Sequence, residues 1–313
     1  MTVPQIQPVD DAAIERAAAM IRGGLCVAVP TETVYGLAAD ATSGEAVARI
    51  YAAKGRPSFN PLITHVESLE QASVYADFSA PALRLAAMFW PGPLTLILRA
   101  RAGSPIAALV TAGLPTIAIR VPAHPVMRAL ITVSQRPLAV PSANASGKIS
   151  ATTAAHVAAS LGDHVPVILD GGPTRHGLES TIVAVEADRL RMLRPGPIDI
   201  AALVAASGLP LSTETSATIE APGQLSSHYA PSKPIRLHAK VPEQNEWMIG
   251  FGEIGGDDTL SPSGDLIEAA SRLFDALHRA DAANTRAIAV APIPQVGLGF
   301  AINDRLERAA APR

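Results

Sequence analysis

Two cations stand two residues apart in segment 54–62, a stretch that also holds one glycine and two prolines. The ammonium of Lys54 is a compact point charge and the guanidinium of Arg56 is a planar fork, so together they suit a polyphosphate. The same residues follow a helical pattern, and cations at a helix C-terminus complement its dipole. The segment alone leaves both interpretations open.

Arg120 interrupts the apolar run 117–121. Burying a guanidinium without an anionic partner is costly, so this residue forms a structural ion pair or receives the carboxylate of a substrate. We favour the second interpretation.

Two further segments are rich in hydroxyl groups. Segment 30–37 carries Thr31, Glu32 and Thr33, which could hold a small polar substrate, although for the segment taken alone a helix cap and turn is the favoured interpretation. Segment 141–150 combines small residues with Ser142, Asn144 and Ser150, so its backbone could approach a nucleotide closely. It lacks the spacing of a Walker A loop, and an ordinary serine-rich turn is the alternative.

A fifth region spans 170–173, 179–183 and 194–196. Its polar candidates are Glu179, Ser180 and Arg194, to which His65 is added from an earlier strand. Each of them taken alone could be a satisfied strand-end residue.

The elements that would position these segments alternate between strand-like and helical patterns. Strands are predicted at 25–29, 62–66, 94–98, 116–121, 137–140, 165–169 and 181–185. Helices are predicted at 12–21, 45–53, 80–90 and 153–162, most of them after a capping Asp, Ser or Thr. This order predicts an α/β domain with a twisted, mixed, open sheet covered by helices, whose ligands lie at the strand ends.

From residue 207 the composition changes to Ser, Thr, Pro and Gly without apolar periodicity, which predicts a linker or a draped loop. Beyond it, strands at 235–237, 247–251 and 287–291 and helices at 264–280 and 302–310 predict a small second α/β domain. The expected division is therefore a catalytic domain at 1–206, a linker at 207–233 and a C-terminal domain at 234–313.

The bulk composition excludes several classes of protein. The chain has 313 residues, 48% hydrophobic and 17% charged, with a formal net charge of -3, so a nucleic-acid binder driven by overall charge is not expected. The single cysteine, Cys26, excludes an internal disulfide and a cysteine-rich zinc site. No secretory signal and no apolar run of about 18 residues is visible, so we expect a cytoplasmic protein without a membrane span.

The joint order of the segments is more specific than any one of them. Thr-Glu-Thr-Val-Tyr-Gly-Leu, Lys-Gly-Arg-Pro, Trp-Pro-Gly-Pro-Leu-Thr, Arg-Val-Pro, Pro-Ser-Ala-Asn-x-Ser-Gly and Glu-Ser-Thr-Ile-Val follow one another along the chain. Over about residues 10–205 this order resembles the YrdC-like threonylcarbamoyl-AMP synthase family. Segments 227–231, 291–294, 297–299 and 301–305 resemble the linker and the Rossmann-like C-terminal domain of its long, two-domain form.

The resemblance implies a nucleotidyltransferase that makes L-threonylcarbamoyladenylate from L-threonine, bicarbonate and ATP with release of pyrophosphate. A partner transferase would then use the adenylate to modify adenosine 37 (t6A) of tRNAs that read ANN codons, and a weak direct contact with tRNA stays open. Mg2+ is expected to accompany ATP, held by phosphates and water, with no metal ligands from the protein.

The resemblance also assigns site residues. For L-threonine it implies Thr33, His65, Arg120, Ser180 and the backbone at Val140. For ATP it implies Arg56, Asn60, Thr116, Ser142, Ser150, Arg194 and, from the linker, Tyr229. Lys54 is expected beside the phosphates, so that Lys54 and Arg56 would be the catalytic cations.

Two other functions compete with this one. The chain could be a non-catalytic, translation-associated RNA-binding module whose basic surface is formed by Lys54, Arg56, Arg120, Arg175 and Arg194. It could also act on another carbamoyl donor, as do maturation enzymes of the same fold, but those carry zinc-finger segments that one cysteine cannot supply.

Overall fold

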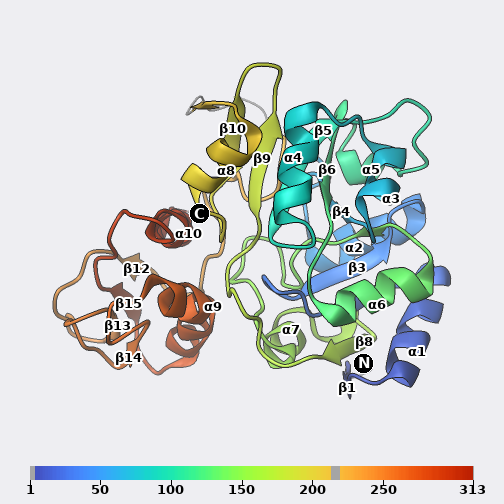
Figure 1. Cartoon of the computed structure of the whole chain (residues 1–313). Coiled ribbons are helices and arrows are strands. Elements are labelled where there is room, and N and C mark those ends of the chain that lie inside the picture. The colour runs from blue at the N-terminus through green and yellow to red at the C-terminus, as the bar shows by residue number, and fades with distance from the viewer. Residues whose placement is uncertain (1–3, 213–218, 313) are drawn as a thin grey trace.

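In a computed structural model of the protein, which describes residues 4–212 and 219–312, two bodies lie side by side (Figure 1). The larger contains an 11-stranded sheet and the smaller a four-stranded sheet, and helices pack on both. The predicted mixed α/β architecture with a second, smaller α/β unit is confirmed.

The large sheet has the strand order β1-β8-β2-β3-β7-β4-β6-β5-β9-β10-β11 and mixes parallel with antiparallel pairs. Its strands are β1 (Gln5–Pro8), β2 (Val27–Val29), β3 (Gly36–Asp40), β4 (Ile63–His65), β5 (Leu94–Arg99), β6 (Thr116–Arg120), β7 (Leu138–Ala139), β8 (Val167–Asp170), β9 (Thr181–Val185), β10 (Leu190–Arg194) and β11 (Leu211–Ser212). In the centre, β4 runs parallel to β6 with His65 opposite Arg120. This register brings two predicted site residues from distant segments together.

The helices of the large body begin where the sequence predicts caps. The side chains of Asp10, Ser43, Ser79 and Thr153 each accept a backbone N–H of the following first turn. These helices are α1 (Asp11–Arg22), α2 (Gly44–Lys54), α4 (Ala80–Phe89) and α7 (Ala154–Leu161); the others are α3 (Leu69–Tyr75), α5 (Ala108–Thr111), α6 (Pro125–Ser134), the 3-10 turn η1 (Gly162–His164) and α8 (Ile200–Ser207).

Several elements were not predicted, β3 and α6 among them. Gly36 and Leu37 looked like part of a ligand-binding turn, yet they open β3, which is buried along its whole length. Helix α6 begins after His124, whose ring nitrogen accepts the N–H of Val126 at 3.3 Å, and a histidine cap is not a recognised start signal.

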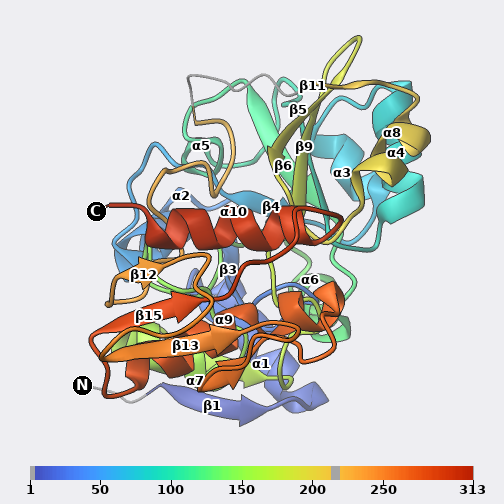
Figure 2. The same ribbon diagram turned by 90° about the vertical axis from the view of Figure 1, so that its left-hand side faces the viewer.

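The small body has the order β12-β15-β13-β14, with every pair parallel. Its elements are β12 (Ile235–Arg236), β13 (Glu246–Gly250), β14 (Asp258–Thr259), α9 (Leu266–Ala282), β15 (Ala287–Val290) and α10 (Gly299–Ala310). Figure 2 looks onto this body and shows α10 running above its strands.

The backbones of the two bodies come close to each other at one point. Gly177 has a φ of +67°, and a Cβ added to it would lie 2.5 Å from the carbonyl oxygen of Ser271 in α9. Nearby, the ring Nε2 of His278 lies 3.0 Å from the carbonyl oxygen of Ser150. Helix α9 is therefore seated directly on loops of the large body.

Residues 213–218 of the predicted linker lie outside the described part of the chain. Before them, β11 pairs in parallel with β10, so residues 211 and 212 belong to the large sheet. After them, segment 219–234 crosses from one body to the other, and Ala230 forms a β-bridge with Lys148. None of the described helices is long and apolar enough to cross a membrane.

Candidate active site

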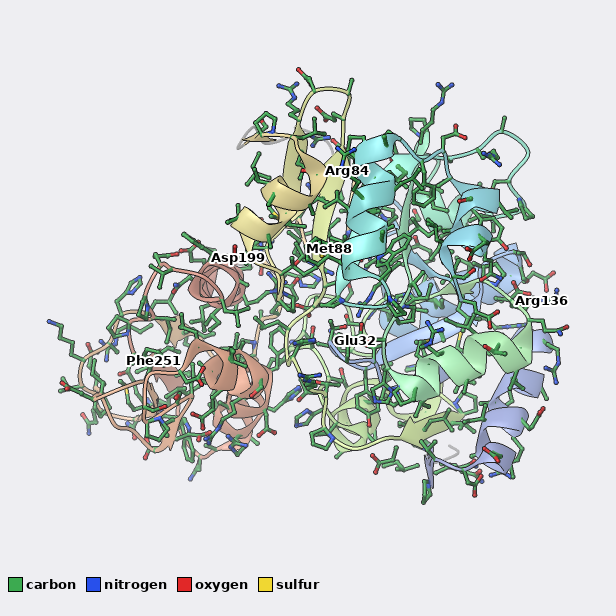
Figure 3. All side chains as sticks on the ribbon, in the orientation of Figure 1. Glu32, Arg84, Met88, Arg136, Asp199 and Phe251 are labelled. Carbon is green, nitrogen blue, oxygen red and sulfur yellow. The ribbon has the colours of Figure 1, made fainter. Side chains whose placement is uncertain are left out.

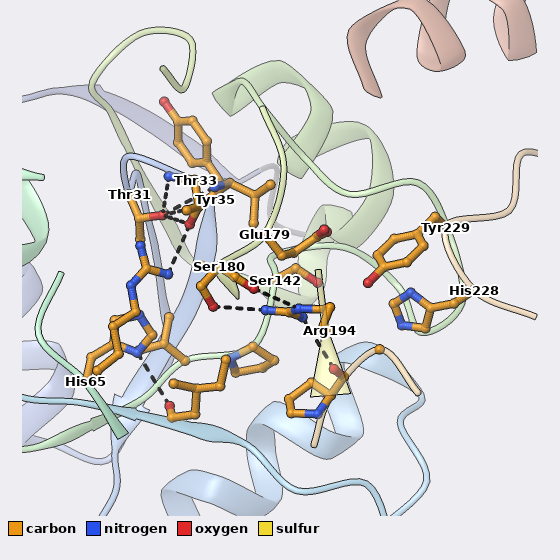
Figure 4. A pocket seen from close by; sticks show the side chains of 18 of the residues that line it. Thr31, Thr33, Tyr35, His65, Ser142, Glu179, Ser180, Arg194, His228 and Tyr229 are labelled. Carbon is orange, nitrogen blue, oxygen red and sulfur yellow. Dashed lines mark hydrogen bonds between the residues drawn. The ribbon is translucent and has the colours of Figure 1, made fainter. Parts of the chain in front are cut away.

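A cavity of about 40 Å³ lies where the ends of the central strands meet the linker (Figure 4). Nine of the residues predicted for the site line it: Thr33, Arg56, His65, Arg120, Val140, Ser142, Ser180, Arg194 and Tyr229. In Figure 4, Thr33 and His65 lie on one side, Tyr229 on the other, and Ser180 with Arg194 between them. Segments more than 190 residues apart in sequence thus meet in one cavity.

Arg120 forms a buried ion pair on the first side of the cavity. Its Nη2 lies 2.5 Å from Oε1 of Glu32, its Nη1 donates to Oγ1 of Thr33 at 3.1 Å, and its Nε donates to the carbonyl of Gly92. Burial alone would raise the pKa of Glu32, but the charge and hydrogen bond of Arg120 lower it to about 2. Figure 3 shows Glu32 in the interior of the molecule. Arg120 therefore has an anionic partner within the chain, and it also reaches the cavity.

His65 stands beside Arg120 and is neutral. Burial, followed by the positive charge of Arg120, lowers the pKa of the imidazole to about 3. Its Nδ1 lies 3.5 Å from the carbonyl of Ile63, and its buried Nε2 has no hydrogen-bond partner among the described residues. An unpaired ring nitrogen in a polar cavity is available to a ligand.

Arg56 and Arg194 also line the cavity, but they are held by neutral oxygen atoms. Arg56 donates to the carbonyls of Asn60 (3.1 Å) and Pro61 (2.9 Å), and Arg194 donates to the carbonyl and the hydroxyl of Ser180, both at 3.0 Å. No ion pair between described residues includes either arginine. Burial is the main cause that lowers the pKa of both, that of Arg56 to about 10, so Arg56 remains charged at neutral pH.

Lys54 does not line the cavity, contrary to its predicted place beside the phosphates. Its ammonium donates to the carbonyls of Ser142, at 2.5 Å, and Asn144. Burial, then the neighbouring Arg56, lowers the pKa of the ammonium well below its usual value. Because its ammonium already donates to two backbone carbonyls, Lys54 holds the backbone of segment 141–150 in place.

Three other predicted ATP residues are also absent from the cavity lining. Thr116 begins β6, roughly 13 Å from Arg120 at its other end, given about 3.3 Å per strand residue. Asn60 is buried, and its side-chain amide has no partner among the described residues. The hydroxyl of Ser150 donates to Oε1 of Glu179, which does line the cavity.

The linker closes the cavity from the side of the small body. Tyr229 is fully buried at a φ of 60°, with its ring tilted against Phe274 at 5.5 Å between centroids. The ring of His228 packs edge-on against it at 4.0 Å, and the guanidinium of Arg305 lies 5.2 Å from its centroid. Sequence reasoning assigned no site role to Phe274 or Arg305, because nothing local relates them to residues more than 40 positions away.

The geometry argues against an exposed basic surface. Of the five cations that the RNA-binding hypothesis needs, Lys54, Arg56, Arg120 and Arg194 are at most 9% exposed. Arg175 alone among them is exposed. Four of the five charges therefore face the interior and cannot contact a phosphate backbone.

Comparisons with known proteins agree with the arrangement. Residues 19–196 match the family described as "Telomere recombination" (Sua5/YciO/YrdC), and residues 198–311 match the threonylcarbamoyl-AMP synthase C-terminal domain. The curated threonylcarbamoyl-AMP synthases of Pyrococcus abyssi and Bacillus subtilis are each 39% identical to the chain, covering 96% and 97% of it and 94% of each relative.

A solved structure shows the same two-domain architecture. The P. abyssi protein Sua5, crystallised in complex with L-threonine, superposes with a TM-score of 0.89 at 36% identity, over 99% of this chain and 97% of that one. The matches in both domains, over nearly the full length, show that the chain is an enzyme of the two-domain threonylcarbamoyl-AMP synthase family.

Proposed function

We propose that the protein joins L-threonine, bicarbonate and ATP into L-threonylcarbamoyladenylate and releases pyrophosphate. One observation carries the proposal: a single cavity is lined by a paired arginine beside a neutral histidine and by two arginines that form no ion pair with a described residue. The first group suits a small zwitterion and the second a polyphosphate.

On the first side, Arg120 and the hydroxyl of Thr33 would receive the carboxylate and hydroxyl of threonine. The neutral imidazole of His65 adds no positive charge against the amine, which must lose a proton before its nitrogen attacks bicarbonate. The N–C bond of the carbamate then forms and water leaves. The carbamate oxygen then attacks the α-phosphate of ATP, a P–O bond forms, and the bond to pyrophosphate breaks. The complex of the P. abyssi relative with L-threonine supports L-threonine as the amino-acid substrate.

On the second side, Arg56, Arg194 and Ser142 would hold the phosphates and the sugar. Phosphoryl and nucleotidyl transfer depend mainly on positioning and on stabilising developing charge, which buried guanidinium groups supply. We propose that Mg2+ enters with the phosphates and water as its ligands, because Glu179, which lines the cavity, and Glu32, the partner of Arg120, are each bound by an arginine.

We also propose that the linker is a lid. Sites for drug-sized ligands usually measure about 300–1,000 Å³, whereas this cavity of about 40 Å³ holds only a few waters. Pro222, Gly223, His228 and Tyr229 all belong to its wall, so ATP can enter only when the linker moves away. Its return would exclude water from the mixed anhydride.

The decisive experiment is a mass-spectrometric assay with ATP, L-threonine and ¹³C-bicarbonate. The expected product is the labelled adenylate with one equivalent of pyrophosphate, formed only when all three substrates are present. Serine should be used about tenfold or more less efficiently, because a pocket shaped for one extra methyl gains roughly 1–3 kcal/mol from it. ATP turnover that is equal with and without an amino acid would refute the proposal.

The adenylate is an activated acyl donor, so we propose that a partner transferase consumes it for t6A37 in ANN-reading tRNAs in the cytoplasm. Adding that transferase and such a tRNA to the assay should convert labelled adenylate into labelled tRNA. A transferase that modifies the tRNA equally well without this protein would contradict the assignment.

A further inference from the structure

Arg305 of the C-terminal domain contacts Glu179 in the wall of the cavity, and its side chain is 0% exposed. It lies in α10. Its Nε donates to Oε2 of Glu179 at 2.8 Å, its Nη2 to the carbonyl of Pro195 at 2.9 Å, and its Nη1 contacts Asp304 at 2.6 Å. The face of the same guanidinium lies near the ring of Tyr229.

Its partners in the large body are parts of the proposed ATP side. Glu179 lines the cavity and accepts the hydroxyl of Ser150 with its other oxygen. Pro195 directly follows Arg194 in sequence, and Tyr229 belongs to the lid. One side chain of the small domain therefore contacts three segments of the site at once.

The charge arrangement gives this contact a function. Glu179 is buried, which alone would raise its pKa, and two cations lower it: Arg305 with the larger effect and Arg194 with the smaller. Since Arg305 makes the hydrogen-bonded ion pair, Arg194 keeps its guanidinium on Ser180 and forms no ion pair with a described residue. Without Arg305, Arg194 is the cation whose charge still acts on the buried carboxylate.

We propose that Arg305 is a positioning residue that reserves Arg194 for the nucleotide by holding Glu179. The C-terminal domain thereby completes the ATP side of the site, while the threonine side, built on Arg120 and Glu32, is independent of it. This inference rests on the proposed function for the identity of the nucleotide.

The test is calorimetric titration of the full-length protein with ATP and, separately, with L-threonine. Arg305→Met keeps an unbranched side chain but removes the charge, so Glu179 turns toward Arg194 and ATP affinity should fall about tenfold or more, while threonine affinity stays within about twofold. In the double variant Arg305→Met/Glu179→Gln no carboxylate competes for Arg194, so ATP affinity should return to within about threefold of wild type.

Three comparisons make the outcome decisive. The control Arg236→Met removes an Arg–Glu pair of the same domain, in which the side chain of Arg236 is 36% exposed and its Nη2 lies 2.5 Å from Glu246, and should leave both affinities unchanged. A purely structural role for Arg305 would weaken both ligands in the single variant, or leave the double variant no better than the single, and either result overturns the proposal. If Arg305→Met does not fold, Arg305→Lys provides the test. It keeps a positive charge beside Glu179, so its ATP affinity should stay within about threefold of wild type, and a tenfold loss would overturn the proposal.

The binding measurements are separate from turnover. If the variants show this pattern of affinities but the wild type makes no threonylcarbamoyladenylate, the proposed function is refuted and the inference about Arg305 stands. If the wild type makes the adenylate but Arg305→Met binds ATP as tightly as the wild type, the inference is refuted and the proposed function stands.

Discussion

The two sides of the cavity bury their arginines in opposite ways. Arg120 is balanced by Glu32 within the chain, whereas among the described residues Arg56 and Arg194 donate only to carbonyl and hydroxyl oxygens. Burying a cation without an anion costs free energy, so the second side is electrostatically incomplete in the ligand-free protein. A zwitterion brings its own opposite charges to the balanced side, and a polyphosphate supplies the missing anions to the other.

The largest effect on stability is expected from breaking the ion pair of the balanced side. Arg120→Met leaves the carboxylate of Glu32 buried and unpaired, which typically destabilises a fold by about 3–5 kcal/mol. Urea denaturation should show this loss, and Arg120→Met/Glu32→Gln should recover most of it while still failing to bind threonine. A single variant as stable as wild type would show that the ion pair does not stabilise this side.

The neutral histidine of the balanced side predicts a pH dependence. The pKa of His65 is about 3 in the folded protein and near 6.5 in the unfolded chain, so the unfolded state binds more protons between these values. Stability from this site is complete above about pH 6.5 and is lost as the pH falls. Relative to His65→Gln, the wild type should lose about 2–3 kcal/mol between pH 6.5 and 4.5, measured by denaturation at each pH. A parallel pH dependence in the two proteins would contradict a neutral His65.

On the incomplete side, Arg56→Met should separate stability from function. It removes a charge-assisted contact of about 1.5–3 kcal/mol to a phosphate, and so lowers ATP affinity roughly 10- to 100-fold. The cost to folding should be smaller than for Arg120→Met, because no carboxylate is left unpaired. Calorimetry and denaturation on the same samples check both statements, and a loss of stability without a loss of ATP binding would reverse the comparison.

The smallest effect concerns Asn60, whose buried amide has no partner in the described structure. Replacing an unsatisfied polar group with an apolar one of the same shape is nearly neutral, so Asn60→Leu should change the free energy of unfolding by about 1 kcal/mol or less. ATP affinity should nevertheless fall if the amide serves the nucleotide, as the family resemblance implies. A clearly destabilised variant would mean that the amide is satisfied in solution.

Local signals explain what could be predicted from the sequence. The helix cap at Ser43 and strand β9 are each determined by residues adjacent in sequence. The bounds of α2 and β9 were both predicted to within one residue. Of the predicted residues that line the cavity, His65, Arg120 and Arg194 are each the last residue of a strand. The partners of charged groups could not be predicted, because Arg120 and Glu32 are 88 residues apart and Arg305 and Glu179 are 126 apart.

Lys54 illustrates the same limit. Its position beside Arg56 suggests a shared ligand, but the two side chains leave the chain at the end of α2 in different directions. The carbonyls that hold its ammonium belong to residues about 90 positions away. Residue type and spacing therefore indicate that a cation is needed near this point, whereas the fold decides whether a substrate or the backbone receives it.

The contact at Gly177 couples sequence change in one domain to sequence change in the other. Any side chain at this position would meet the backbone of Ser271, and a positive φ already disfavours every other residue there. A substitution at position 177 could spread through a population only if α9 had already shifted, and a shift of α9 would in turn disturb the residues that α10 presents to the cavity. Selection on catalysis would therefore act on a backbone contact outside the cavity lining. A C-terminal domain exchanged from a distant relative would function here only if it left the same space for Gly177.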